Sequence, residues 1–218
     1  MDECIPPLIR DSRWFMYPFY WYAYRGKNLR QVMDFKRLVH TFTEEDYKAF
    51  YAGLDTISRN RATDLNEPSI RFMIGRLDAR ARTLLDVGSG NGYFLHRLRH
   101  TALELHGCDI VDRDPGRTYA FTLASAERLP YADKQFDIVT CSHTIEHLLD
   151  LPKAITELKR VARRQLIIAT PCQRYFYYTL DEHVHFFPHR HTLTSLIGMR
   201  NHECRKLRGD WVYVGYTE

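Results

Sequence analysis

The sequence lacks several patterns that would assign it to a specialised class of protein. None of its 218 residues belongs to an uninterrupted run of about 18 apolar residues, so we expect no membrane-spanning helix. The N-terminus has no continuous apolar segment of the signal-peptide type. The five cysteines include no C-x-x-C pair, which excludes a zinc knuckle or redox dithiol of that spacing. Scattered free thiols are typical of a reducing compartment, so we expect a cytoplasmic protein.

Concentrated positive charge is also missing. The chain has 31 Lys and Arg against 27 Asp and Glu, a net charge of +4, and no run of five basic residues. This mild excess attracts nucleic acid only weakly, so we expect no nucleic-acid partner. Hydrophobic residues make up 44% and charged residues 27% of the chain, as in ordinary globular proteins, and the length suits one domain.

Residues 1–80 differ from the rest and are predicted to form a helical N-terminal cap within the same domain. Residues 14–24 are dense in aromatics with basic neighbours, and apolar residues follow at helical spacing over 29–39. Thr43 is expected to cap a helix, and Pro68 to lie near the start of another, after a loop over Ser58–Asn66. The aromatic segment has three interpretations: packing as a lid or pocket wall, a contact between two subunits, or contact with a membrane surface or lipid substrate. A monomer and a homodimer both remain open.

From residue 81 onward, strand-like and helical segments alternate, which predicts a doubly wound α/β fold with a mostly parallel sheet. Helices are expected over Pro152–Ala162 and after Thr192. The short connection at Gly209-Asp210 predicts a terminal antiparallel hairpin. The expected seven strands of this core, residues 81–218, are Thr83–Val87, Glu104–Asp109, Tyr119–Leu123, Phe136–Ser142, Gln165–Thr170, Glu203–Leu207 and Trp211–Tyr216.

The most informative segment begins at Asp86, which ends the first expected strand. Gly88, Gly90 and Gly92 follow at every second position. A residue without Cβ lets a ligand approach the backbone, here at the carboxyl end of a parallel strand and beside a helix N-terminus. Tyr93 stands where a dinucleotide fingerprint needs its third glycine, and no Lys-Ser/Thr follows as in a P-loop. The D-x-G-x-G-x-G pattern resembles motif I of the class I S-adenosylmethionine (SAM)-dependent methyltransferases.

This resemblance implies a SAM site spread over several strand ends. Asp86 and the first glycines would meet the cationic methionine end, and Asp109, which ends the second strand, would hold the ribose hydroxyls. Residues 124–131 and 136–139 resemble a block of the ubiquinone/menaquinone-type methyltransferases, in which Ser125 and the Ala126 amide would meet adenine. The predicted cofactor-binding residues are Asp86, Gly88, Ser89, Gly90, Asp109, Ser125, Ala126, Glu127 and Ser142.

Acids and imidazoles follow the fourth and fifth strands. If residues 142–147 are helical, His143, Glu146 and His147 share one side, and a second group over 181–191 includes His183. One interpretation is acid–base or substrate contact, with His147 as the first candidate base and His143 and His183 as further candidates. Another is a structural role. A third is a divalent metal on His143, Glu146, His147 and His183, which a resemblance to small-RNA 3′-terminal 2′-O-methyltransferases implies. We expect no metal, because His143 replaces the first glutamate of that pattern and leaves a poor ligand set for Mg²⁺.

The sequence therefore predicts a SAM-dependent methyltransferase that acts on a small-molecule acceptor, at oxygen. Two alternatives stay open. One is a 2′-O-methyltransferase of RNA ends, suggested by the acid–histidine resemblance. The other is a SAM-binding subunit without activity of its own.

Overall fold

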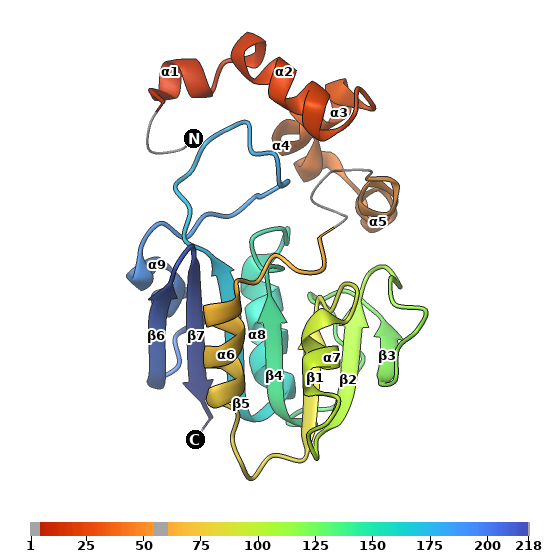
Figure 1. Ribbon diagram of the computed structural model, residues 1–218, viewed down its shortest axis with the longest axis vertical. Helices are drawn as coiled ribbons and strands as arrows, with labels where there is room; N and C mark the ends of the chain where they lie inside the picture. Colours follow the sequence, from red (N-terminus) through yellow and green to blue (C-terminus); the bar gives the residue numbers. More distant parts are fainter. Residues whose placement is uncertain (1–4, 55–60, 218) are drawn as a thin grey trace.

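The computed structural model describes residues 5–54 and 61–217. In Figure 1 an α/β sandwich lies below a group of short helices. Seven strands form one sheet in the order β3-β2-β1-β4-β5-β7-β6, in which β1 to β5 pair in parallel and β7 is antiparallel to β5 and β6. The predicted fold class and terminal hairpin are confirmed. The strands are β1 (Thr83–Val87), β2 (Glu104–Asp109), β3 (Ala120–Leu123), β4 (Phe136–Ser142), β5 (Ala162–Pro171), β6 (Asn201–Leu207) and β7 (Asp210–Tyr216).

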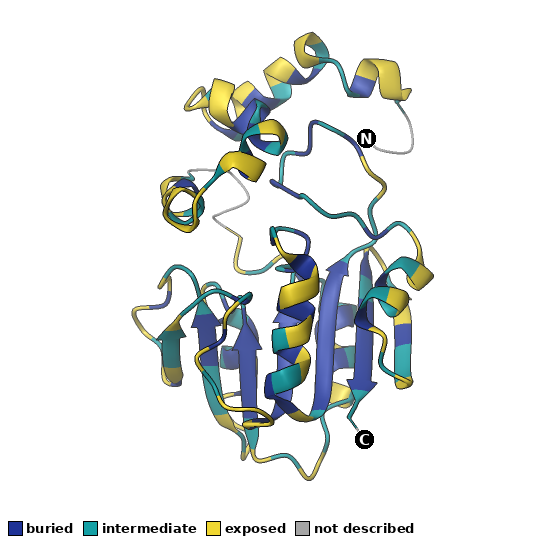
Figure 2. Cartoon of the chain, turned by 180° about the vertical axis from the view of Figure 1, so that it is seen from behind, coloured by how far each residue is buried: buried dark blue, intermediate teal, exposed yellow. Residues whose placement is uncertain are grey.

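Both faces of the sheet are covered by helices. Neighbouring residues on a strand point to opposite faces, and Leu84 and Leu85 accordingly join different apolar clusters. Leu84 packs with α6 (Glu67–Gly75) and α7 (Tyr93–Leu98), and Leu85 packs with α8 (Leu151–Val161) and α9 (Arg190–Ile197). The central strands are buried along most of their length, as expected for parallel strands between two helical layers (Figure 2).

The N-terminal helices form a third cluster above the carboxyl edge of the sheet. Its buried members include Met16, Tyr20, Phe35, Phe50 and Tyr178, the last from the loop that follows β5. Thr43 caps its helix as predicted, with reciprocal bonds to Asp46. The helices are α1 (Pro7–Arg10), α2 (Arg13–Ala23), α3 (Leu29–Met33), α4 (Phe35–Leu38), a 3-10 turn (Val39–Thr41) and α5 (Glu44–Gly53). The sixth helix, α6, lies within the predicted cap segment 1–80 but packs on the sheet.

Several predicted boundaries need correction. β5 begins at Ala162 rather than Gln165, because Arg163 and Arg164 extend the strand while their guanidinium groups pair with the buried Asp137. Helix α8 therefore ends one residue earlier than predicted, and α9 begins two residues before Thr192. The hairpin turns at Arg208 and Gly209, and Asp210 already belongs to β7. Residues 58–60 of the predicted loop lie outside the described residues.

The sequence predicted no membrane-spanning helix and free cysteine thiols, and both expectations can be compared with the described part of the chain. None of its helices is long and apolar enough to cross a bilayer. Cys108, Cys141, Cys172 and Cys204 are free thiols, and Cys4 lies outside the described residues.

The packing of α8 generates a stability prediction. Leu158 is fully buried between α8 and the sheet, so Leu158→Ala leaves a cavity and should lower the free energy of unfolding by about 2–5 kcal/mol. Thr156→Ala, on the exposed side of the same helix, should change it by less than about 0.5 kcal/mol. Urea unfolding measures both, and equal losses would contradict the assigned burial.

Candidate functional site

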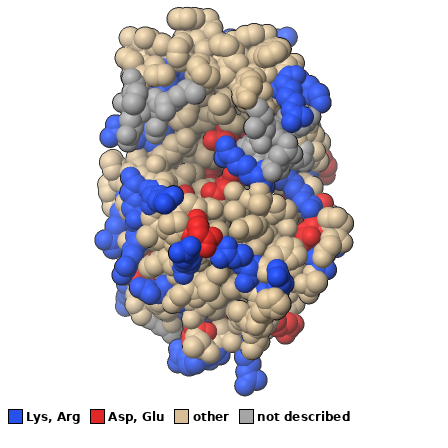
Figure 3. All heavy atoms as spheres, viewed as in Figure 1, with Lys and Arg blue, Asp and Glu red and all other residues tan. Residues whose placement is uncertain are grey.

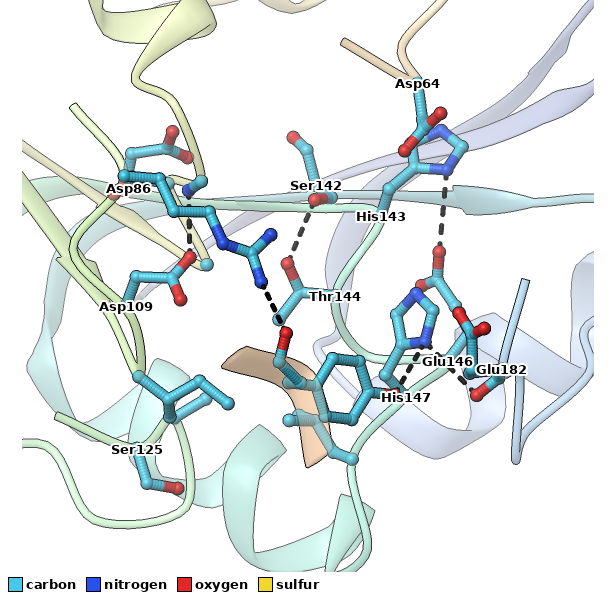
Figure 4. Close-up of a pocket in the computed structure, with 18 of the residues that line it drawn as sticks. Asp64, Asp86, Asp109, Ser125, Ser142, His143, Thr144, Glu146, His147 and Glu182 are labelled. Carbon is cyan, nitrogen blue, oxygen red and sulfur yellow. Dashed lines mark hydrogen bonds and ion pairs between the residues drawn. The ribbon is translucent and has the colours of Figure 1, made fainter. Parts of the chain in front are cut away.

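A large cavity lies between the carboxyl edge of the sheet and the N-terminal helices. Its volume is about 1010 Å³. Every residue predicted to bind the cofactor or to act in catalysis lines it, and so does Glu146. Figure 4 shows that these residues come from the ends of separate strands and from the loop after β5. The structure therefore assembles the predicted residues at one place, although their roles remain predictions.

The glycine loop after β1 is shaped by three residues with positive φ. Gly88, Gly90 and Gly92 have φ of 74°, 54° and 72°, a region that residues with Cβ rarely adopt. A Cβ on Gly88 would lie 2.1 Å from Thr144 Oγ1, and one on Gly92 would lie 2.1 Å from the Tyr119 hydroxyl. A Cβ on Gly90 would meet nothing within 4 Å. Gly88 and Gly92 are therefore required by packing, whereas Gly90 borders open space in the cavity.

Two acids flank this loop. Asp109 accepts bonds from the Gly90 and Val111 amides, at 2.8 and 3.1 Å, and Figure 4 shows the first of these. Burial raises the pKa of Asp109. Asp86 is buried and accepts a 2.7 Å bond from the Thr140 hydroxyl. Burial raises the pKa of Asp86 to about 7, so a cation bound beside it would favour its charged form.

The segment after β3 contributes backbone and side-chain groups. Glu127 Oε1 accepts from the Leu149 and Asp150 amides at 3.0 Å each, which ties this segment to the start of α8. Ser125 Oγ accepts a 3.2 Å bond from the Glu127 amide. Figure 4 shows Ser125 at the edge of the same pocket as Asp109.

Buried polar atoms in the cavity test whether a polar ligand fits. Ser89 Oγ and Ser142 Oγ are buried and have no hydrogen-bond partner among the described residues, yet both residues line the cavity. A buried hydroxyl without a partner is costly, so these atoms fit a site in which a polar ligand binds them. These two hydroxyls and the open space at Gly90 fit a ligand that has several hydrogen-bonding groups, such as SAM.

Residues 143–147, for which a helix was one alternative, form a turn. The His143 amide donates to the Ala169 carbonyl at 2.8 Å, so strand pairing continues to His143, which then turns with φ of 48°. Its Nδ1 lies 3.5 Å from Glu146, and its Nε2 lies 3.4 Å from Asp210. Burial lowers the pKa of His143, but these two carboxylates outweigh it and the net pKa is raised. Figure 4 shows His143 apart from His147.

The His147 ring is held by two groups. Its Nδ1 lies 3.3 Å from the Glu182 carbonyl oxygen and 3.2 Å from the Tyr51 hydroxyl. Because a carbonyl oxygen only accepts, this contact is a hydrogen bond in the tautomer that has the proton on Nδ1 and the lone pair on Nε2. The Tyr47 hydroxyl donates to the His147 carbonyl at 2.6 Å. Sequence reasoning missed both tyrosines; their i, i+4 spacing on α5 alone indicates only a shared helix face.

The other histidines divide between the cavity and the surrounding structure. His183 Nδ1 lies 2.7 Å from Gln173 Oε1, and its ring centroid lies 4.9 Å from that of His147. Burial and the neighbouring His147 lower the pKa of His183 well below its usual range. His185 instead bonds the Leu148 carbonyl, outside the cavity.

Among the described residues, the four candidate metal ligands His143, Glu146, His147 and His183 do not form one cluster. Glu146, His147 and His183 place potential ligand atoms within 4.8 Å of one another, and His143 is not part of that group. Glu146 accepts a 3.1 Å bond from the Thr170 hydroxyl. Its carbonyl accepts from the Val184 and His185 amides, which fastens the loop after β5 to this turn.

Helix α2 holds the loop after β5 from above. The Tyr20 hydroxyl donates to the Thr179 carbonyl at 2.6 Å, and the Tyr24 hydroxyl donates to Leu180 at 3.1 Å and to the Glu182 carboxyl. Burial raises the pKa of Glu182 to about 8. The cap therefore determines where Glu182, and through it the ring of His147, lies.

Known proteins resemble the part of the chain that carries this site. Residues 85–169 match the family model of a methyltransferase domain. An uncharacterized methyltransferase of Mycolicibacterium gilvum is 35% identical over 149 residues, which are 63% of this chain and 53% of that protein. The YcgJ methyltransferase of Bacillus subtilis is 30% identical over 105 residues, 43% of this chain and 42% of that protein. The chain spans about half the length of the curated relatives it matches.

Solved structures resemble it in fold. A SAM-dependent methyltransferase from Archaeoglobus fulgidus aligns with a TM-score of 0.56 and 18% identity, over 68% of this chain and 91% of that one. A SAM-dependent methyltransferase from Thermotoga maritima aligns with a TM-score of 0.59 and 17% identity, over 84% of this chain and 98% of that one. Residues 85–169 are therefore similar to a methyltransferase domain, and the sheet order and the glycine loop at the end of β1 occur in a chain with the fold of these SAM-dependent methyltransferases.

Proposed function

We propose that the protein transfers the methyl group of SAM to a hydroxyl oxygen of a small molecule. The observation that carries this proposal is one cavity lined both by the glycine loop and by His147, whose Nδ1 lies 3.3 Å from the Glu182 carbonyl oxygen. Its volume of about 1010 Å³ is at the upper end of the usual range for one ligand, so a cofactor and a second small molecule fit together.

The cofactor half of the cavity supplies complementary groups for each part of SAM. Asp86 faces the cationic methionine end, and Asp109 has carboxylate lone pairs for the ribose hydroxyls. Ser125 and Ala126 lie where adenine would be bound. Ser89 and Ser142 offer the buried hydroxyls that lack a protein partner. Bound SAM supplies an electrophilic methyl group on a sulfonium.

The acceptor half supplies a base and a fixed geometry. His147 Nε2 takes the proton of the acceptor hydroxyl, while the Glu182 carbonyl holds Nδ1–H and stabilises the ring orientation in both protonation states. The lowered pKa of His183 keeps it neutral, and it orients the acceptor from its place beside His147. Much of the rate comes from holding the nucleophile in line with the methyl group.

The two alternatives predict different results. An RNA-end methyltransferase would transfer methyl to an RNA 3′ end and lose activity as salt is raised. A subunit without activity would bind SAM but release no S-adenosylhomocysteine with any acceptor. Screening labelled SAM against hydroxyl-bearing metabolites and short RNAs separates the three functions.

The open space at Gly90 generates a binding prediction. Calorimetry should show S-adenosylhomocysteine binding with one site per chain, and Gly90→Val should abolish it, because a branched side chain fills the space that the ligand needs. Gly209→Val is a control for the added volume alone: a Cβ there also meets nothing within 4 Å, but Gly209 lies in the hairpin turn away from the cavity and has no positive φ. Unchanged affinity in Gly90→Val would place the ligand elsewhere.

The buried Asp86 generates a pH prediction. Below a pKa of about 7 its carboxyl is protonated and attracts a cation weakly; above it, the carboxylate attracts the cation fully. SAM affinity should therefore rise between about pH 5.5 and 7.5, by at most about tenfold per pH unit. Asp86→Asn should bind SAM more weakly and without this rise. If the rise persists in that variant, another group is responsible.

The assignment of His147 generates a kinetic prediction. With an acceptor from the screen, His147→Ala should lower kcat by about 10²–10⁴-fold and leave SAM affinity nearly unchanged, because the ring faces the acceptor. His185→Ala, a histidine outside the cavity, should retain kcat. EDTA should leave the native enzyme active. Inactivation by EDTA with restoration by one metal would contradict the role of His147 as a base.

A further inference from the structure

Helix α2 is apolar around its whole circumference, yet only one side of it is covered. Met16 and Tyr20 are buried against the other cap helices. Trp14, Tyr17 and Trp21, at positions i, i+3 and i+7, share the opposite side and are 75%, 49% and 57% exposed. A helix on the surface of a globular protein normally presents polar residues on that side.

Two further residues extend this surface. Leu8 of α1 is 93% exposed, and Tyr22 of α2 is 71% exposed. We call Leu8, Trp14, Tyr17, Trp21 and Tyr22 the aromatic face. Helices α1 and α2 form the end of the molecule farthest from the sheet (Figure 1), and Figure 3 shows that this end is mostly uncharged, with basic atoms at its edges.

Basic residues outnumber acids beside the aromatic face: Asp11, between α1 and α2, pairs with Arg10 at 3.4 Å. Between Asp11 and Asp34 the chain has no acid and four basic residues. Of these, Arg25 and Arg30 are exposed and form no ion pair with any described residue. Asp34 is already paired with Arg13 at 2.7 Å and with Arg37 at 3.5 Å. The surroundings of the aromatic face therefore carry net positive charge.

We propose that the aromatic face docks the protein on a bilayer surface that contains anionic lipids. Trp and Tyr have rings with an apolar body and a polar edge, which suits the boundary between acyl chains and headgroups. Arg25 and Arg30 meet the negative headgroups beside it. Helix α2, with 11 residues, lies along the surface, as interfacial helices do.

The charge pattern argues against a second copy of the chain as the occupant. A two-fold symmetric contact pairs the same surface of both subunits, so it would bring the basic residues of the two copies together. An anionic surface avoids this repulsion and neutralises them.

Docking would place the cavity next to the bilayer. The covered side of α2 bonds Thr179, Leu180 and Glu182 through Tyr20 and Tyr24, so one helix separates the membrane from the loop that lines the acceptor half. This inference concerns where the protein works, and it holds whatever the acceptor is.

Sedimentation of the full chain with vesicles tests the proposal. Vesicles of phosphatidylcholine with phosphatidylglycerol should bind the protein at least about tenfold more tightly than vesicles of phosphatidylcholine alone. Binding should also shift tryptophan fluorescence to shorter wavelength, since two of the three tryptophans belong to the aromatic face.

Variants locate the surface that binds. The double variant Trp14→Ala/Trp21→Ala and the double variant Arg25→Glu/Arg30→Glu should each weaken vesicle binding by about tenfold or more. Leu123→Ala removes a leucine that is 63% exposed at the end of β3, outside the aromatic face, and should bind vesicles like the native protein. All variants should keep the native affinity for S-adenosylhomocysteine, which shows that they are folded.

Three results would overturn the proposal. The first is no binding to anionic vesicles. The second is binding that Leu123→Ala weakens as much as the tryptophan variant does. The third is a dimer in analytical ultracentrifugation that Trp14→Ala/Trp21→Ala dissociates, which would assign the aromatic face to a second copy of the chain.

Discussion

The parallel pairing of β1 with both β2 and β4 is the constraint on which the site depends. In this register Asp86 lies beside Gly107 of β2 and Thr140 of β4, so the three strands end at one level. The strand order reverses between β1 and β4, and the segments that follow them diverge to opposite faces of the sheet. The crevice between them receives the glycine loop from one side and the turn with His147 from the other.

The N-terminal helices complete this crevice from above through tyrosine hydroxyls. Tyr20 and Tyr24 hold the loop after β5, and Tyr47 and Tyr51 hold His147. Because Glu182 is bonded by Tyr24 and its carbonyl orients His147, the cap and the acceptor half form one hydrogen-bonded unit. The aromatic residues of segment 14–24 therefore have two roles. On the covered side of the helix they pack and form hydrogen bonds, and on the other side they form an uncovered apolar surface.

The sequence predicted the sheet well because buried parallel strands leave a strong local signal. The alternation of strand-like and helical segments identified β1, β2 and β4 at their observed limits, and the glycine spacing identified the loop. The predictions from the sequence were wrong where contacts between residues distant in the chain decide the local structure. The pairing of Arg163 with Asp137 extends β5, and the bond from His143 to Ala169 continues strand pairing where a helix was one alternative. Tyr47 and Tyr51 reach the cavity from a helix whose spacing alone indicates only ordinary core packing, and Tyr24 reaches Glu182 from the end of α2. The assignment of individual residues to SAM or to catalysis stays a prediction.

The central claim is that SAM is bound at the carboxyl ends of β1 and β2 with its methyl group directed toward His147. A crystal structure with S-adenosylhomocysteine tests it most directly. We expect the ribose hydroxyls within hydrogen-bond distance of Asp109, the amino acid end beside Asp86 and Gly88, and the sulfur facing the His147 side of the cavity. A nucleoside bound outside this crevice, or a sulfur directed away from His147, would contradict it.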